Sequence, residues 1–139
     1  MVTPVLQAYA EHGPITILQI DAHIDWRDEV NGERWGLSST MRRASEMGWV
    51  EQILLVGARS VGSARTEDYE HALSAGAKFF TMREFRQQGA AAVVDAIPPD
   101  SRLFITLDVD GLDPTIMPSV IGPAPGGLAY WDFVDLVEG

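Results

Sequence analysis

An apolar run near the start of the chain ends in three evenly spaced residues whose side chains can bind metal. Residues 15–20 are almost all aliphatic or β-branched, and Asp21, His23 and Asp25 follow them at every second position. Side chains alternate between the two faces of a strand, so these three side chains share one face if the backbone stays extended. The pattern predicts a buried strand with a metal site at its carboxyl end.

A second stretch, residues 103–114, repeats this design. An apolar run to Leu107 is followed by Asp108 and Asp110, and Gly111 and Pro114 then signal a turn. Asp is also common in turns, so this stretch alone is weak support for a metal. Carboxylates clustered at one sheet edge repel one another unless a cation lies between them. Together the two stretches therefore predict a dinuclear metal site.

The rest of the chain alternates expected helices and strands. We expect strands over residues 15–20, 53–56, 78–80 and 103–108. We expect helices over residues 3–10, 40–47, 63–75, 81–96 with an interruption at Gly89, and from 129 onward. This order is typical of an α/β domain with a mostly parallel sheet covered on both faces. Ligands bind outside the carboxyl ends of such strands, where both acidic stretches lie.

Length and composition limit the class of protein. A chain of 139 residues with 46% hydrophobic content suits one domain, which we assign to residues 1–139. The formal charge of −10 disfavours nucleic acid and anionic membrane as partners, because phosphate binding needs a basic surface. The sequence has no cysteine, no transmembrane-length apolar run and no signal-peptide pattern at its start. We expect a cytoplasmic protein whose metal is held by oxygen and imidazole.

The two metal motifs resemble the signature motifs of the ureohydrolase (arginase/agmatinase) family. They read Asp21-Ala-His-Ile-Asp25 and Thr106-Leu-Asp-Val-Asp-Gly-Leu-Asp-Pro114, and Gly122-Pro-Ala-Pro-Gly-Gly127 resembles the family segment that follows them. The resemblance covers essentially the whole chain and is closest to the agmatinase branch. It implies a three-layer α/β/α arginase fold and two Mn²⁺ ions. It also implies hydrolysis of a small cationic guanidinium substrate, agmatine, to putrescine and urea by a metal-bridging hydroxide.

The resemblance also implies roles for single residues. Asp21 and Asp108 would bridge the two metal ions and their hydroxide, which makes them the catalytic pair. Asp25 would complete the shell of one ion, and His23 and Asp110 would belong to the other. All five are therefore expected metal ligands.

Three further residues are candidates for supporting roles. Asp113 would support the ligand loop, although a turn capped before Pro114 explains it equally well. Arg59 follows a predicted strand and could orient a carboxylate ligand or pair with a loop acid. Trp26, beside the first motif, could form a wall of the substrate site.

The chain also departs from the family pattern. The family places another histidine ligand in a Gly-Gly-Asp-His stretch before the first helix, and a substrate-contacting acid beyond the last helix. Neither falls within these 139 residues, and residues 36–40 lack the usual His-Gly. We therefore expect an arginase-like domain that is incomplete at both ends.

The incomplete pattern leaves two other functions open. One is a promiscuous metal-dependent amide or ester hydrolase, and the other is a non-catalytic metal-binding remnant that acts as an assembly module. A sheet that is cut short exposes unpaired strand edges, which proteins rarely leave uncovered. We therefore also expect a homo-oligomer.

Overall fold

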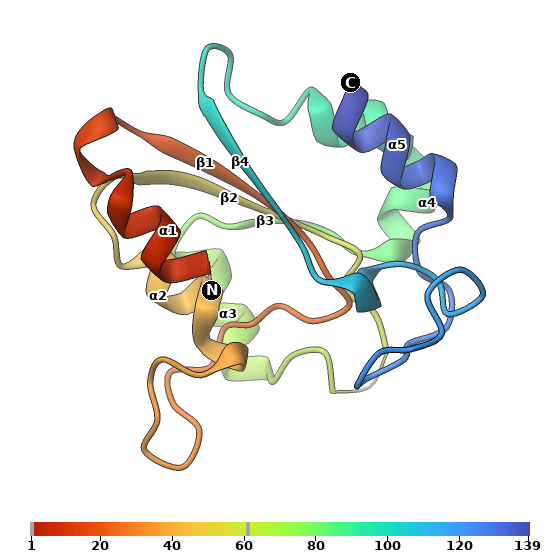
Figure 1. Cartoon of the computed structure of the whole chain (residues 1–139), viewed down its shortest axis with the longest axis horizontal. Coiled ribbons are helices and arrows are strands. Elements are labelled where there is room, and N and C mark those ends of the chain that lie inside the picture. The colour runs from red at the N-terminus through yellow and green to blue at the C-terminus, as the bar shows by residue number, and fades with distance from the viewer. Residues whose placement is uncertain (1, 61) are drawn as a thin grey trace.

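A parallel four-stranded sheet organises the protein (Figure 1). The computed structural model describes residues 2–60 and 62–139. The strand order is β3-β2-β1-β4, and the strands are β1 Ile15–Ile20, β2 Val50–Val56, β3 Lys78–Phe80 and β4 Arg102–Leu107. β1 pairs with β4 so that Ile20 lies opposite Leu107. The two acidic motifs therefore leave neighbouring strands at the same edge.

Helices cover both faces of this sheet, which confirms the expected three-layer α/β/α arrangement (Figure 1). One face packs against α1 Val2–Ala8, α2 Thr40–Ser45 and α3 Thr66–Ser74. The other face packs against α4 Met82–Val94 and α5 Tyr130–Glu138. Every residue of β1 is buried, because β1 has a strand on each side and a helical layer on each face. No helix in the described ranges has the length and apolarity needed to cross a membrane.

Short 3₁₀ turns complete the framework at Ala10–His12, Leu37–Ser39 and Val109–Gly111, labelled η1, η2 and η3. The η3 turn carries part of the second acidic motif. A capping box begins α4, since the Thr81 hydroxyl accepts the N–H of Glu84 and the Glu84 carboxylate accepts the N–H of Thr81. The expected interruption at Gly89 is also confirmed, because this glycine has a φ of 77° within α4.

Several element boundaries differ from the expected ones. α1 runs from Val2 to Ala8 rather than from residue 3 to residue 10. β2 begins at Val50, three residues early, because Val50 pairs with Ile15 across a register shift. α3 begins at Thr66 rather than at residue 63. These shifts lie away from the acidic motifs and leave their positions unchanged.

Candidate metal centre

Asp21 lies at the centre of the acidic cluster, directly after β1, and is only 3% exposed. Its Oδ2 accepts a hydrogen bond of 2.7 Å from Nε2 of Gln19, which is itself buried. Its Oδ1 accepts a hydrogen bond of 2.7 Å from the backbone N–H of His23. These two contacts fix the orientation of the Asp21 carboxylate at the sheet edge.

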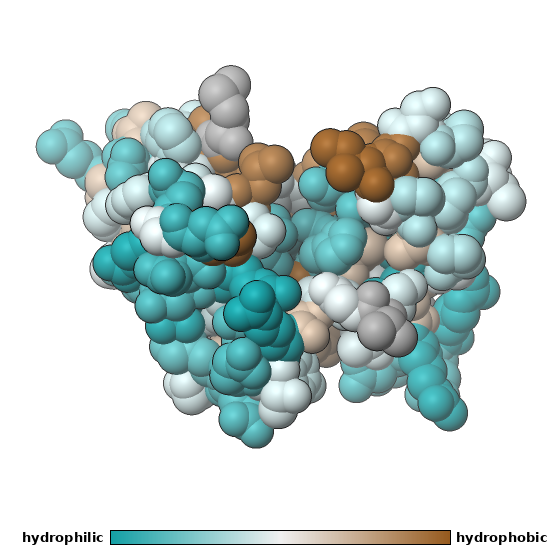
Figure 2. Space-filling model, turned by 90° about the horizontal axis from the view of Figure 1, so that it is seen from below, coloured by the Kyte–Doolittle hydropathy of each residue, from teal (hydrophilic) through white to brown (hydrophobic). Residues whose placement is uncertain are grey.

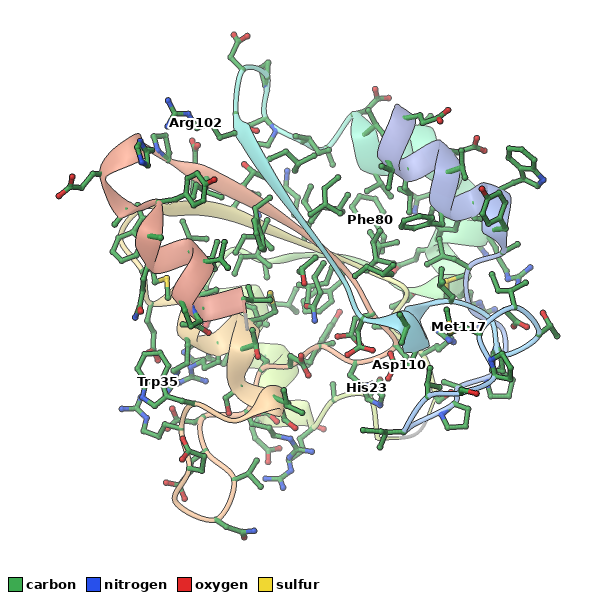
Figure 3. The ribbon with its side chains drawn as sticks, in the orientation of Figure 1. His23, Trp35, Phe80, Arg102, Asp110 and Met117 are labelled. Carbon is green, nitrogen blue, oxygen red and sulfur yellow. The ribbon has the colours of Figure 1, made fainter. Side chains whose placement is uncertain are left out.

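His23 and Asp110 lie beside Asp21 and close the cluster. The Nδ1 of His23 lies 3.1 Å from Oδ2 of Asp110 and 3.5 Å from Oδ1 of Asp21. Asp110 also accepts the backbone N–H of Ala22 at 3.1 Å, which ties η3 to the end of β1. Figure 3 shows His23 and Asp110 adjacent at the end of the sheet. One ligand atom from each of the three residues lies within 4.8 Å of the others, a separation that one ion can bridge.

Asp25 and Asp108 lie next to this trio rather than in it. Together with Asp21 they line a neighbouring cavity of about 390 Å³. The strand ends at Ile20, and Asp25 has a φ of 49°, so the expectation of one extended motif is wrong. The bend arises because the Asp25 carbonyl accepts the backbone N–H of Met41 at 3.0 Å, which ties the motif to α2.

The charges of these carboxylates are not balanced within the described residues. Burial, followed by the charge of Asp25 and smaller contributions from Asp110 and Asp108, raises the pKa of Asp21 to about 9. Burial and the charges of Asp108 and Asp110 raise the pKa of Asp25 to about 7. A divalent cation would supply the missing positive charge. The donor set of carboxylate oxygens and one imidazole fits Mn²⁺ or a similar oxygen-preferring ion.

The cavity beside the cluster has one acidic end and apolar walls. Its apolar lining includes Val5, Leu37, Met41 and Phe104, contributed by α1, η2, α2 and β4. Figure 2 shows the carboxyl-end face of the molecule, where a hollow separates two lobes and hydrophobic residues gather on both sides at one end. The shape allows a molecule with a polar, cationic head and an apolar stem to reach the carboxylates.

Arg59 contacts the backbone of the ligand loop. Its Nη2 donates hydrogen bonds of 2.6 Å to the carbonyl of Asp110 and 2.6 Å to that of Ala124. Its guanidinium also donates to the carbonyls of Gly57, Gly111 and Leu112. The two roles considered for Arg59, orienting a carboxylate ligand and pairing with a loop acid, are therefore not the contacts it makes. Arg59 instead joins the end of β2 to both ends of the loop.

Asp113 closes the same loop from its exposed side. Its Oδ1 accepts from the hydroxyl and the N–H of Thr115, and its Oδ2 accepts from the N–H groups of Gly126 and Gly127. These hydrogen bonds, with the Thr115 hydroxyl first, lower the pKa of Asp113 to about 2. Asp113 thus caps a turn and links the loop ends, so its two expected roles coexist in one set of contacts.

Trp26 lies in the core and does not line the 390 Å³ cavity, but it lines a smaller pocket of about 70 Å³ together with His23 and Asp25. It is 1% exposed, and its Nε1 donates a hydrogen bond of 3.0 Å to Nδ1 of His71. His71, which accepts this hydrogen bond, is half-buried.

Sequence reasoning missed Gln19 as a site residue. A lone glutamine within an otherwise apolar buried strand was the available signal, because a buried amide needs a polar partner. Gly122 was also missed, although a Cβ at this position would lie 3.5 Å from Cε1 of His23. Its position depends on the loop path, which no local pattern predicts.

Comparison with known proteins gives relatives across nearly the whole chain. The chain is 33% identical over 138 residues to N(1)-aminopropylagmatine ureohydrolase of Thermus thermophilus, covering 97% of this chain and 45% of that protein. It is 31% identical over 138 residues to mitochondrial arginase 1 of Arabidopsis thaliana, covering 97% and 40%. The solved arginase of Medicago truncatula superposes with a TM-score of 0.84 at 27% identity, covering 97% of this chain and 42% of that one.

The chain therefore spans less than half the length of these relatives. A family described as the Arginase family matches residues 1–139. The parallel sheet, the paired acidic motifs at its edge and this match lead to one conclusion: the chain belongs to the arginase, or ureohydrolase, family.

Proposed function

We propose that this chain carries the metal centre of a Mn²⁺-dependent ureohydrolase that acts on a small cationic guanidinium compound such as agmatine. The observation that carries the proposal is the convergence of Asp21, His23 and Asp110 within 4.8 Å beside an acidic, partly apolar cavity. Membership of the family and the ureohydrolase named among the relatives support the reaction class. The family assignment does not identify the substrate, so we base the proposed substrate class on the cavity.

The chain's own side chains divide the work of holding metal. Asp21, His23 and Asp110 would hold one ion, and Asp25 and Asp108, which share a cavity with Asp21, would take part in holding a second. When bound, such ions act as Lewis acids that lower the pKa of water and polarise the bond to be cleaved. Gln19 keeps one Asp21 oxygen engaged at 2.7 Å and so limits the rotation of that carboxylate.

The apolar walls of the cavity suit the stem of an alkylguanidinium ion. They would receive its methylene groups, while Asp21, Asp25 and Asp108 at the acidic end would hold metal. Gln19 also lines the cavity, and its Oε1 is buried and lacks a partner among the described residues.

A second candidate function is metal binding without turnover. It is favoured by the observation that the close ligand group contains three residues, while Asp25 and Asp108 lie outside it. A protein of this kind would hold one ion at the trio and would serve as an assembly module. The two candidates differ in the number of ions bound and in turnover.

The deciding experiment measures Mn²⁺ stoichiometry by calorimetry and urea release from agmatine on the same preparation. We expect two ions per chain and urea release, with both reduced in Asp108→Asn. Asp135→Asn, the same chemical change at an exposed helix position, is the matched control and should behave as the unmodified chain. One ion with no urea from agmatine would favour the second candidate, and no Mn²⁺ binding would exclude both.

A further inference from the structure

Asp25, an expected ligand of the second ion, has a backbone conformation that needs support from its surroundings. Its φ of 49° lies in the left-handed region, which non-glycine residues keep only where surrounding contacts hold them. We infer that the buried Arg43 is a positioning residue that acts through Asp28 to hold Asp25 in this bend. The consequence for metal binding rests on the proposed function, in which Asp25 takes part in holding the second ion.

The backbone of Asp25 is tied to α2. Its carbonyl accepts the N–H of Met41 at 3.0 Å and that of Arg42 at 3.3 Å. α2 begins at Thr40, so both donors belong to its first turn, where N–H groups have no partner inside the helix. The bend at Asp25 therefore completes α2, and a movement of Asp25 would expose these two donors to water.

A side-chain contact joins the same two segments. Nη2 of Arg43 donates a hydrogen bond of 2.8 Å to Oδ1 of Asp28 and one of 2.8 Å to Oε1 of Glu46. The Arg43 side chain is 2% exposed, and its Nε and Nη1 are buried without a hydrogen-bond partner among the described residues. Water screens such a contact less than it screens a pair that is exposed on both sides. The hydrogen bond from Arg43 also lowers the pKa of Asp28, so this carboxylate stays ionised.

Asp28 can act on Asp25 because the chain between them is rigid. Trp26 is 1% exposed, and the N–H of Arg27 donates to the carbonyl of Ser38 at 2.8 Å, across the base of the loop that leads to α2 (Figure 1). The two intervening residues therefore form a fixed connection rather than a hinge. A displacement of Asp28 is passed on to Asp25, whose carboxylate lines the 390 Å³ cavity.

The three closer ligands are held by separate contacts. Asp21 accepts hydrogen bonds from Gln19 and from the His23 N–H, and Asp110 accepts the N–H of Ala22. Loss of the arginine contact should therefore weaken the second ion and leave the ion at the trio in place. A general loss of stability would weaken both ions.

Amide hydrogen exchange of the metal-free chain tests the bend directly. In chelator, Asp28→Ala should speed exchange of the Met41 N–H about tenfold, because its acceptor moves away, and should leave the amides of β1 unchanged. Asp28→Glu keeps a carboxylate within reach of Arg43 and should retain most of the protection. Glu29→Ala, at the next exposed position, is the matched control and should exchange as the unmodified chain does. Unchanged Met41 exchange in Asp28→Ala would overturn the inference.

A double variant tests whether Arg43 acts through Asp28. Arg43→Met removes the charge and keeps a side chain of similar length, and it should also speed exchange of the Met41 N–H. Adding Asp28→Ala to this variant should have no further effect, because both changes break the same contact. Additive effects would show that the two residues act separately and would contradict the link through Asp28.

Calorimetric titration with Mn²⁺ separates positioning from a general loss of stability. We expect Asp28→Ala to weaken binding of the second ion about tenfold and to leave the affinity for the first ion unchanged. Equal weakening of both ions, or of neither, would overturn the positioning role. A single ion in the unmodified chain would count against the proposed function, whereas exchange in the metal-free chain would still decide whether Arg43 holds the bend.

Discussion

The surroundings of Asp21 and its role as a metal ligand favour different protonation states. A metal ligand must be ionised, yet burial and three neighbouring carboxylates favour the protonated form and raise its pKa to about 9. Its hydrogen bonds from Gln19 and the His23 N–H oppose this shift only in part. The metal-free site is therefore a source of instability that a cation would remove.

This conflict predicts the pH dependence of the metal-free chain. The folded pKa of Asp21, about 9, lies above the ordinary value of 3.8, so the folded chain binds more protons than the unfolded chain between these values. Stability is then greatest below pH about 4 for this group and is lost as the pH rises through about 9. Thermal unfolding in chelator should show a midpoint that falls as the pH is raised. Asp21→Asn should flatten this dependence, and an unchanged slope would show that Asp21 is not its source.

Arg59 provides a second test at this scale. Replacing it with Met removes the donors that five backbone carbonyls share and leaves part of that loop unsatisfied. We expect a loss of about 3 kcal/mol in the free energy of unfolding. The free energy of unfolding of Arg59→Lys should lie between those of the unmodified chain and Arg59→Met, because one ammonium reaches fewer carbonyls than a planar guanidinium. Denaturant titration measures both, and equal stability of all three proteins would contradict this role.

Single residues also show how far sequence reasoning reaches. The acidic motifs stand out because Asp and His interrupt the apolar pattern at strand ends, and Asp21, His23 and Asp110 do come together. The contacts of Arg59 and the burial of Trp26 were not predictable, because both depend on where a distant loop or helix returns. Local spacing identifies candidate ligands, whereas tertiary structure decides what surrounds them.

At the scale of elements, the close approach of η3 to the end of β1 sets the geometry of the centre. A Cβ on Gly111 would lie 2.9 Å from the backbone nitrogen of Asp21 and 3.1 Å from its Cα, so only glycine fits without a shift. This contact holds the two acidic motifs together. Alternation of apolar runs predicted the elements, whereas this approach distance depends on the strand order, which the sequence alone does not specify.

The substitution Gly111→Ala tests this approach. The added methyl group would push η3 away from β1, and we expect a loss of about 1–3 kcal/mol in stability with a larger proportional loss of Mn²⁺ affinity. Gly48→Ala is the matched control, since a Cβ there meets nothing within 4 Å. Denaturant titration and calorimetry on both variants separate the effects. Equal behaviour of the two variants would show that η3 accommodates the methyl group freely.

At the scale of the whole molecule, metal binding and folding should be coupled. The ligands come from the ends of two strands that meet only in the folded sheet, so Mn²⁺ binds the folded chain far better than the unfolded one. The α/β class was predictable because helices and strands alternate along the sequence. The strength of the coupling between metal binding and folding was not predictable from the sequence. It depends on how completely the cavity and the second acidic motif surround an ion.

Such coupling predicts a stabilisation that follows the ion concentration. At Mn²⁺ about 100-fold above its dissociation constant, one bound ion adds about 2.7 kcal/mol to the free energy of unfolding. The midpoint of thermal unfolding should therefore rise steadily with Mn²⁺, and the rise should be smaller at lower pH, where protons compete for Asp21. Asp110→Asn removes one of the three converging ligands and should abolish most of the rise, whereas Asp135→Asn should keep it. A midpoint that does not respond to Mn²⁺ would mean that the carboxylates tolerate their proximity through protonation alone.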